Sequence, residues 1–467
     1  MRICLILEGC YPYVNGGVSS WMHQYITEMT EHEFVLLTLG AYSKDRGKFK
    51  YQLPENVVEI KEMFLDGITD LDEAQLELPR SLNDREKGAL KNLIACQSPD
   101  WAVLFELFHV GQLQPLAFLQ SQVFLDLLTE IVAENHHHQA FAEFFHSTRS
   151  MLLPVLYLMT QELPKADIYH SIATGYAGLL ASLGSYLYQV PLFLTEHGIY
   201  TREREEEILR SDWVLPTMKK RWIQFFYMLS NLIYDRAVRV TSLYTKAKFI
   251  QEEVGCDLEK CQVISNGIHY DRFANIPLKK EDGWIDIGAV VRIAPIKDIK
   301  TMLYVFFELS QRVPKVRLHI LGAVGDESYY QECLQLMKQL DIKNVVFTGQ
   351  VDVISYMEKL DFTILTSISE AQPLSVIESM AARRPCVTTD VGCCRELLEG
   401  SKEDKLGRAG YCVPPTYRVG LTHAMEKMCS SRQLREKMGE IGQKRAKTYY
   451  RYEKMIGQYR DLYLEVE

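Results

Sequence analysis

Short apolar runs alternate with amphipathic stretches over two long regions of the chain. The first region opens with a strand-like run at Ile3–Glu8, a loop containing Asn15-Gly16-Gly17, and a helical pattern over residues 18–30. Because strand and helix alternate in this way in right-handed parallel crossovers, we predict a doubly wound α/β domain. Its other strands are expected at Phe34–Gly40, Val57–Ile60, Asp167–Ser171, Leu192–Glu196 and Ala237–Thr241.

The same alternation restarts in the second half of the chain, after a linker at 275–283 that contains Pro277 and a charged cluster. We therefore predict a first domain over 1–275 and a second over 276–448. A terminal helix within 449–467 is expected to pack back on the first domain. The second domain is predicted to contain strands at 284–292, 315–321, 344–348, 362–366 and 385–389, with helices at 301–312, 329–340, 353–359 and after Pro373.

Between residues 64 and 161 the alternation stops. Helical periodicity replaces it, as in the stretch Trp101–Phe108. A structureless linker of this length is improbable in a compact domain. We interpret the segment as a helical insertion on the first domain, serving as a cap or a partner surface.

Composition narrows the class of protein. The chain has 467 residues, 47% of them hydrophobic and 24% charged, and a net charge of -9, which argues against a nucleic-acid binder. Its eleven cysteines show no disulfide or zinc spacing, which favours a reducing compartment. No apolar run reaches the ~18 residues that span a bilayer, so a membrane connection would go through a partner or a surface patch.

Two carboxylates seven positions apart carry the strongest chemical signal. Glu370 lies in a loop, and Glu378 lies within the helix that follows Pro373. Proline suits the first turn of a helix, and the unpaired N–H groups there form a phosphate seat. Glu370 would face the group attached to that phosphate, and Glu378 would accept hydrogen bonds from a ribose. The spacing alone is more often a surface loop and a solvated helix face.

Other candidate binding residues lie directly after strands of the two predicted sheets. Arg292 and Lys297 follow the first strand of the second domain and would neutralise a diphosphate, although each alone is more often a surface cation. Gly16 and Gly17 would let a phosphate or sugar approach the backbone closely, or simply form a turn. Ligands in such sheets bind at the carboxyl ends of strands, and we expect the two domains to face each other across a cleft.

A histidine and two neighbours complete the set. His197 ends the strand Leu192–Glu196 and would hydrogen-bond a sugar, although a lone histidine is more often structural. Tyr200 and Arg202 would contact an acceptor or begin a charged helix. Asn266-Gly267 is interpreted as a tight turn with Gly267 at positive φ. Two acidic or histidine-rich stretches, Asp70-Leu71-Asp72 and His136-His137-His138, do not form a convincing metal site.

Taken together, these motifs resemble those of the retaining glycosyltransferases of family 4, which have the two-domain GT-B fold. The resemblance covers nearly the whole chain except the insertion. A closer resemblance is to the PelF family of cytosolic glycosyltransferases in Pel exopolysaccharide synthesis. It is carried by Glu8–Trp21, Thr195–Glu203 and Arg292–Asp298.

The resemblance implies a role for each matched residue. The donor-binding residues would be Gly16, Gly17, Arg292, Lys297, Gln350, Val351, Leu374, Ser375 and Glu378, with uracil held by the backbone at Gln350 and Val351. Glu370 would contact the transferred sugar, and His197 would lie near its anomeric side. Tyr200 and Arg202 would lie on the acceptor side.

The resemblance also implies an activity. A sugar would pass from a UDP-sugar to a growing Pel-type polysaccharide with retention, without a metal or cofactor. The protein would be cytoplasmic, with an inner-membrane exopolysaccharide synthesis complex as a partner and no nucleic acid. Two alternatives stay open: a nucleotide-sugar epimerase, and a regulatory subunit that binds a nucleotide-sugar without transferring it.

Overall fold

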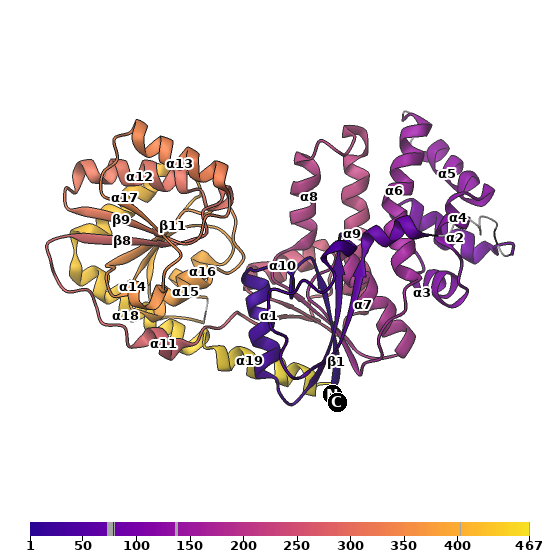
Figure 1. Ribbon diagram of the computed structural model, residues 1–467, viewed down its shortest axis with the longest axis horizontal. Coiled ribbons are helices and arrows are strands. Elements are labelled where there is room, and N and C mark those ends of the chain that lie inside the picture. Colours follow the sequence, from indigo (N-terminus) through magenta and orange to yellow (C-terminus); the bar gives the residue numbers. More distant parts are fainter. Residues whose placement is uncertain (72–77, 79, 136–138, 402, 467) are drawn as a thin grey trace. The chain divides into compact units, whose positions relative to one another are not determined.

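The protein forms two compact units in the computed structural model, which describes residues 1–71, 78, 80–135, 139–401 and 403–466 (Figure 1). One unit is made of residues 1–242 and 247–262, and the other of residues 243–246 and 263–467. This division lies earlier than the predicted linker, because the short helix α11 (Tyr270–Ala274) packs on helices of the second unit. The packing of the terminal helix on the first domain stays a prediction.

The first unit is built on a seven-stranded sheet in the order β3-β2-β1-β4-β5-β6-β7. Strand β1 pairs in parallel with β2 on one side and with β4 on the other. Because it is covered on both sides, its five residues from Ile3 to Leu7 are apolar and buried. The strands are β1 (Arg2–Glu8), β2 (Glu33–Gly40), β3 (Val57–Phe64), β4 (Ile168–Ser171), β5 (Leu192–Glu196), β6 (Arg239–Ser242) and β7 (Cys261–Val263).

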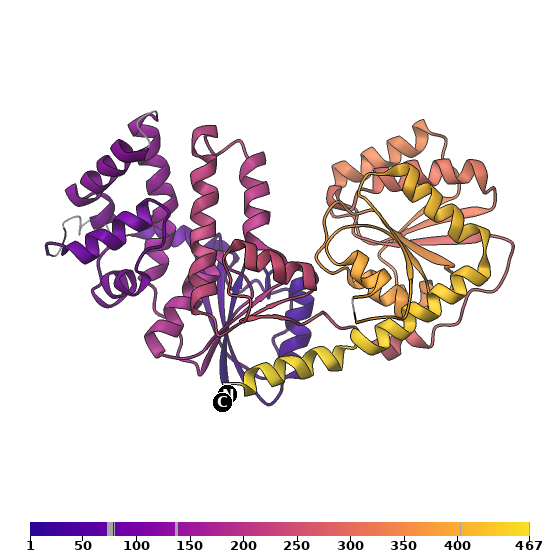
Figure 2. The same cartoon turned by 180° about the vertical axis from the view of Figure 1, so that it is seen from behind.

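Helices cover both faces of this sheet, as the two opposite views show (Figures 1 and 2). Helix α1 lies on one face, and α7 and α9 pack against each other on the other face. The predicted doubly wound architecture is therefore confirmed. These helices are α1 (Gly17–Glu28), α7 (Gly175–Tyr188), α8 (Tyr200–Arg210), α9 (Lys219–Arg236) and α10 (Thr245–Val254).

The insertion between β3 and β4 is helical, and it packs on the unit through contacts between α6 and α7. Its helix α2 begins with a capping box, in which the Asn83 side chain accepts from the Glu86 N–H and the Glu86 carboxylate accepts from the Asn83 N–H. The helices of the insertion are α2 (Asp84–Ile94), α3 (Trp101–Phe105), α4 (Pro115–Leu119), α5 (Gln122–Asn135) and α6 (Phe141–Met159).

The second unit repeats the architecture with six strands in the order β10-β9-β8-β11-β12-β13. The paired residues Ile287 and Leu318, like Ala289 and Ile320, are completely buried where β8 and β9 run side by side. The strands are β8 (Ile285–Val290), β9 (Val316–Leu321), β10 (Val345–Gly349), β11 (Phe362–Leu365), β12 (Cys386–Thr389) and β13 (Gly410–Val413).

Two helical layers enclose this sheet (Figures 1 and 2). One layer contains α12, α13 and α17, and the other contains α14, α15 and α18. The helices of the second unit, besides α11, are α12 (Ile299–Arg312), α13 (Glu327–Gln339), α14 (Val353–Met357), α15 (Leu374–Ala381), α16 (Cys394–Glu399), α17 (Arg418–Ser430), α18 (Arg432–Tyr449) and α19 (Tyr452–Leu464).

Gly267 is not at positive φ, so the predicted reason for this glycine is wrong. The segment instead runs beside the loop between α18 and α19, with hydrogen bonds from the Ile268 N–H to the Tyr450 carbonyl and from the Tyr452 N–H to the Ile268 carbonyl. A Cβ at Gly267 would lie 2.6 Å from the Arg451 carbonyl oxygen. Close approach of two backbones, rather than a tight turn, requires glycine here.

Candidate functional site

The carboxyl edge of the second sheet gathers the candidates of the second unit. Parallel strands end at the same edge, so the loops after β8, β10 and β11 lie on one side of the unit. Arg292 and Lys297 follow β8, Gln350 and Val351 follow β10, and Glu370 follows β11. The topology therefore brings together residues that are up to 78 positions apart in the sequence (292 to 370).

The loop that carries Arg292 is fixed by backbone hydrogen bonds to the segment after β9. The Ile293 N–H donates to the Ala323 carbonyl over 3.0 Å, and the Gly325 N–H donates to the Ile293 carbonyl over 2.9 Å. A Cβ at Gly325 would lie 2.7 Å from Cδ of Arg292, so this glycine leaves room for the arginine. Arg292 is exposed, and within the described residues no carboxylate forms an ion pair with it. Its guanidinium is available to an anion.

Lys297 contacts Glu370 directly. The Lys297 ammonium lies 2.5 Å from Oε1 of Glu370, and the Ser367 hydroxyl donates to the same oxygen over 2.6 Å. The Thr366 hydroxyl donates to the Lys297 carbonyl, which ties the end of β11 to the loop after β8. Both charges are largely shielded from solvent. The pair joins two residues that were predicted separately, as a phosphate ligand and a sugar ligand.

Helix α15 begins directly after this ion pair. Its first residues are Leu374 and Ser375, both half-buried, and Pro373 precedes them as the N-cap instead of occupying the first turn as predicted. Proline offers no side chain that caps the first turn, and the Val376 N–H donates to the Pro373 carbonyl, so the N–H groups of Leu374 and Ser375 are the ones open to an anion. The charge of Lys297 and the positive end of α15 thus lie at one place.

Glu378 lies one turn further into α15 and is half-buried. Burial raises the pKa of its carboxyl group, and the positive charge of Arg272 on α11 partly offsets this rise. Because burial disfavours the ionised form of this carboxyl group, hydrogen-bond donors close to it would stabilise that form. The two hydroxyls of a ribose would provide them.

Gln350 and Val351 lie at the end of the edge strand β10, two strands from β8. Neighbouring strands are ~4.8 Å apart, so about 10 Å separates the ends of β8 and β10. Gln350 is exposed and Val351 is half-buried, and Asp352 then caps α14 by accepting from the Ser355 N–H. This offset is comparable to the separation of a base from the diphosphate in an extended nucleotide.

Asn266 and Gln372 support this site, although the sequence assigned neither of them a role in it. The Gln372 side-chain oxygen accepts a hydrogen bond of 2.7 Å from the Asn266 N–H, and Oδ1 of Asn266 is buried without a hydrogen-bond partner. The stretch Asn266-Gly267, interpreted from sequence as purely structural, therefore supports the segment that leads into α15. Only the contact between positions 106 residues apart reveals this.

The carboxyl edge of the first sheet carries the other candidates. Gly16 precedes α1 as its N-cap, with an extended φ of -179°, and Gly17 is the first residue of the helix. Both are exposed, and a Cβ added to either would meet no atom within 4 Å. Packing within the unit does not require glycine at these positions, which leaves their exposed backbone for the close approach of a ligand.

His197 follows β5 and is held against Trp21 of α1. The two rings meet edge to face, with centroids 4.4 Å apart. Burial lowers the pKa of His197 to about 4, so the imidazole is neutral near pH 7. Its Nε2 is buried and lacks a hydrogen-bond partner in the structure. A neutral ring with an unused nitrogen is suited to hydrogen-bond a hydroxyl group.

Glu8, at the end of β1, lies in a partly enclosed cluster. Its Oε2 accepts from the Ala177 N–H over 3.1 Å, and Arg204 lies 3.8 Å from its Oε1. Burial raises the pKa of Glu8, while the Ala177 N–H and Arg204 oppose the rise. The Tyr200 ring stacks under Arg204 and is buried, whereas Arg202 is exposed and pairs with Glu253. Contact of Tyr200 or Arg202 with an acceptor stays a prediction.

Over the described ranges, no three His, Cys, Asp or Glu side chains gather as metal ligands would. Asp72 and His136-His137-His138 lie outside those ranges. No helix in the part of the chain that the structure describes combines the length and hydropathy needed to cross a bilayer.

Two family models match the chain, and they meet near the division between the units. Residues 1–259 match "Domain of unknown function (DUF3492)", and residues 273–445 match "Glycosyl transferases group 1". The chain belongs to the DUF3492 family, with a group 1 glycosyltransferase domain in its second half. That domain contains Arg292, Lys297, Glu370 and Glu378.

Curated relatives match part of the chain. An N-acetyl-alpha-D-glucosaminyl L-malate synthase of Bacillus anthracis is 28% identical over 40% of this chain and 49% of its own length. An alpha-monoglucosyldiacylglycerol synthase of Streptococcus pneumoniae is 25% identical over 47% and 51%, and the capsular polysaccharide biosynthesis glycosyltransferase CapM of Staphylococcus aureus is 23% identical over 40% and 49%. The chain thus spans about half the length of the curated relatives that it matches.

Solved structures show the same fold over the whole chain. HepE of Anabaena, in complex with UDP and glucose, superposes with a TM-score of 0.61 at 14% identity and full coverage of both chains. Sucrose-phosphate synthase from Thermosynechococcus elongatus gives a TM-score of 0.60 at 15% identity, covering 99% of this chain and 98% of that one. The fold is GT-B, with two Rossmann-like α/β units, as predicted.

Proposed function

We propose that the protein is a glycosyltransferase that moves a sugar from a UDP-sugar to a growing exopolysaccharide of the Pel type, with retention and without a metal. The observation that carries this proposal is the Lys297–Glu370 ion pair before α15, with Arg292 on the same loop as Lys297 and without an ion-pair partner among the described residues. These groups lie in the segment that matches group 1 glycosyltransferases. The Pel-type acceptor rests on the sequence resemblance alone.

The proposed donor complex follows from the charges of the site. The diphosphate lies against Arg292, Lys297 and the start of α15, so Lys297 exchanges the Glu370 carboxylate for a phosphate. Glu370 is then free to accept hydrogen bonds from the sugar hydroxyls. Glu378 binds the ribose, and the backbone at Gln350 and Val351 holds the uracil. His197 is our candidate for the hydrogen bond to the transferred sugar.

In the transfer step, the bond between the anomeric carbon and the phosphate oxygen breaks, and a bond to the acceptor oxygen forms on the same face. The acceptor proton passes to the leaving diphosphate, whose growing negative charge is stabilised by Arg292, Lys297 and the α15 N–H groups. No enzymatic nucleophile is needed in this front-face route. A sugar trapped covalently on Glu370 would contradict it.

Calorimetric titration tests the proposal. UDP and several UDP-sugars are titrated into the wild type, with Mg²⁺ and with EDTA, and into Arg292→Ala. The matched control is Arg312→Ala. Arg312 is the exposed last residue of α12, and it pairs with Glu426 on α17. We expect metal-independent binding of UDP that weakens at least ~10-fold in Arg292→Ala and not in the control.

Failure of the wild type to bind UDP would overturn the proposed donor, and binding only with Mg²⁺ would overturn metal independence. Release of UDP or change of the sugar without any acceptor would instead favour an epimerase. Binding of UDP-sugars without turnover would favour a regulatory subunit.

A further inference from the structure

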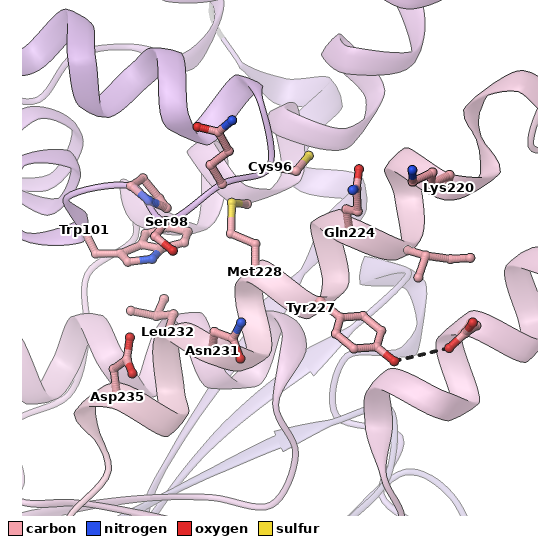
Figure 3. A pocket seen from close by; sticks show the side chains of 14 residues that line it. Cys96, Ser98, Trp101, Lys220, Gln224, Tyr227, Met228, Asn231, Leu232 and Asp235 are labelled. Atoms are coloured by element: carbon pink, nitrogen blue, oxygen red, sulfur yellow. Dashed lines mark hydrogen bonds between the residues drawn. The ribbon is translucent and has the colours of Figure 1, made fainter. Parts of the chain in front are cut away.

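A cavity of about 480 Å³ opens in the first unit between the insertion and α9 (Figure 3). One wall is the loop from Cys96 to Pro99 together with Trp101, and the facing wall is a side of α9. Glu205 on α8 closes one end. None of its lining residues belongs to the site described above. Its volume lies within the ~300–1,000 Å³ typical of ligand sites.

The wall formed by the insertion is held firmly in place. Buried Arg221 on α9 donates a hydrogen bond to the Ile94 carbonyl at the end of α2, and its guanidinium lies over the Phe144 ring, 3.9 Å from the centroid. At the other end of the loop, Asp100 caps α3 and pairs with Arg85 over 2.8 Å. A loop fixed at both ends presents its side chains in a defined arrangement, which lowers the entropic cost of binding.

Within this loop Cys96 has a φ of 54°, a left-handed conformation that costs free energy for a residue other than glycine. Cys96 follows Ala95, the C-cap of α2, and ends this helix in a Schellman arrangement, in which the Cys96 N–H donates to the Leu93 carbonyl and the Gln97 N–H donates to the Asn92 carbonyl. The start of the loop is therefore fixed by the end of α2.

The α9 wall is a stripe of side chains spaced by three or four residues. Gln224, Tyr227, Met228 and Asn231 point into the cavity from successive turns (Figure 3). The Tyr227 hydroxyl donates to Glu205 over 3.3 Å, which orients the ring. Across the cavity stands Trp101. The cavity is thus bounded by two aromatic rings, with amides between them.

The kinds of side chain indicate the class of ligand. Aromatic faces carry partial negative charge and attract the C–H groups of a sugar ring, while amides and carboxylates bond its hydroxyls. A phosphate-bearing ligand does not fit, because the carboxylates of Glu205 and Asp235 outnumber the single cation Lys220. A lipid chain does not fit a lining in which Gln97, Ser98 and Gln224 are polar.

We propose that this cavity binds a neutral segment of the glycan that the protein extends, as an acceptor-holding site built by the insertion. The inference rests on the proposed glycosyltransferase function. It gives a role to the insertion, a segment that has no counterpart among the described residues of the second unit. Holding the chain beyond its reacting end would keep a product bound between additions.

Titration of neutral tetrasaccharides of glucose, N-acetylglucosamine and N-acetylgalactosamine tests the site. The test variants are Gln224→Ala, an exposed residue whose loss leaves the fold intact, and Trp101→Ala. The matched controls in the same unit are Gln122→Ala on α5 and Trp213→Ala, a tryptophan that is 63% exposed. We expect at least one tetrasaccharide to bind, with affinity falling ~10-fold or more in both test variants and in neither control.

UDP titration into the same variants separates the two proposals. Unchanged UDP binding together with lost tetrasaccharide binding supports the site. If UDP binds but no tetrasaccharide does, or if Gln224→Ala binds them as the wild type does, this inference is wrong and the donor site stands. If UDP does not bind the wild type, the proposed function itself fails. Circular dichroism checks that Trp101→Ala is folded.

Discussion

The two units share a parallel doubly wound sheet, yet the carboxyl edges of their sheets differ in chemistry. In the second unit the edge carries full charges: Arg292, and Lys297 paired with Glu370 at 2.5 Å. In the first unit the edge carries groups that burial keeps neutral or drives toward neutrality, such as His197 and Glu8. The same scaffold therefore presents cations in one unit and shielded hydrogen-bonding groups in the other.

The difference matches the two tasks of the proposed reaction. A diphosphate is a strong anion, and fixed cations with a helix N-terminus stabilise it as it leaves. A sugar is neutral, and it is recognised by hydrogen bonds from groups that water does not reach. Architecture alone does not divide these tasks; the side chains at the strand ends do.

The largest expected effect comes from breaking the charged edge at Lys297. Lys297→Ala removes a cation from the leaving diphosphate, so kcat/KM for transfer should fall by about 10²–10³.

Glu370→Gln should separate UDP binding from sugar transfer. The substitution frees Lys297, so the affinity for UDP should rise by about two- to fivefold, while transfer is lost. Calorimetry and a turnover assay measure the two effects. Lys300→Ala, which removes a lysine that pairs with Glu332, is the control.

A loss of UDP affinity in Glu370→Gln would contradict this account of the ion pair. It would mean that the carboxylate assists nucleotide binding instead of competing with it for Lys297.

Next in size is a pH-dependent change in stability within the first unit. Glu196 is buried, where it accepts hydrogen bonds from Tyr234 and Gln251, and burial raises its pKa from 4.5 to about 7. Between these values the folded state keeps a proton that the unfolded state releases, so the free energy of unfolding falls as pH rises. Above pH 7 the loss is complete, at about 3 kcal/mol.

Glu196→Gln keeps an oxygen for the two donors and removes the titration. Relative to the wild type, the variant should gain stability between pH 4.5 and 8, as measured by urea unfolding at a series of pH values. Comparing the two proteins at each pH cancels the opposite contribution of the buried, neutral His170, whose pKa is lowered to about 3. A constant difference across this range would refute the buried titration, and exposed Glu206 provides the Glu→Gln control.

His197 tests the neutral edge directly. His197→Ala should lower the rate of transfer by about 10²-fold, through loss of a hydrogen bond to the sugar, and should leave the affinity for UDP unchanged. Because its pKa is lowered to about 4, the wild-type rate should show no inflection from this group between pH 5 and 8. Exposed His423 on α17 is the control for substitution by Ala. Equal losses in rate and in UDP affinity would place His197 in nucleotide binding instead.

The smallest expected effect concerns the ribose. Glu378→Gln should weaken UDP by about tenfold, the value of a hydrogen bond to a charged group. It should leave 2′,3′-dideoxy-UDP, which lacks both hydroxyls, unchanged. Since the pKa of Glu378 is raised, wild-type affinity for UDP should also fall as pH is lowered through that pKa. Equal losses for both nucleotides would show that Glu378 does not contact the ribose.

The sheets were largely predictable from sequence, because buried parallel strands are continuous apolar runs. Strand β5 was predicted with its observed bounds, and β1, β2, β9 and β10 within one residue. The short terminal strands β7 and β13 were missed, since three or four residues at a sheet edge carry little pattern. The helical nature of the insertion followed from its periodicity.

The site was predictable only in part. The candidates stood out as motifs at strand ends, which the topology then brought to one edge. The Lys297–Glu370 contact, the support of the Gln372 segment by Asn266, and the raised pKa of Glu196 were not predictable. Each depends on residues 38 or more positions apart, and no local pattern reports such a contact.

Release of UDP from a set of UDP-sugars, measured with and without an oligosaccharide acceptor in the wild type and in Lys297→Ala, decides whether the charged edge drives sugar transfer. We expect at least one UDP-sugar to release UDP faster when the acceptor is present, without added metal, and Lys297→Ala to abolish the increase. A rate of UDP release that is the same with and without acceptor, or an increase that persists in Lys297→Ala, would contradict the proposed role of this edge.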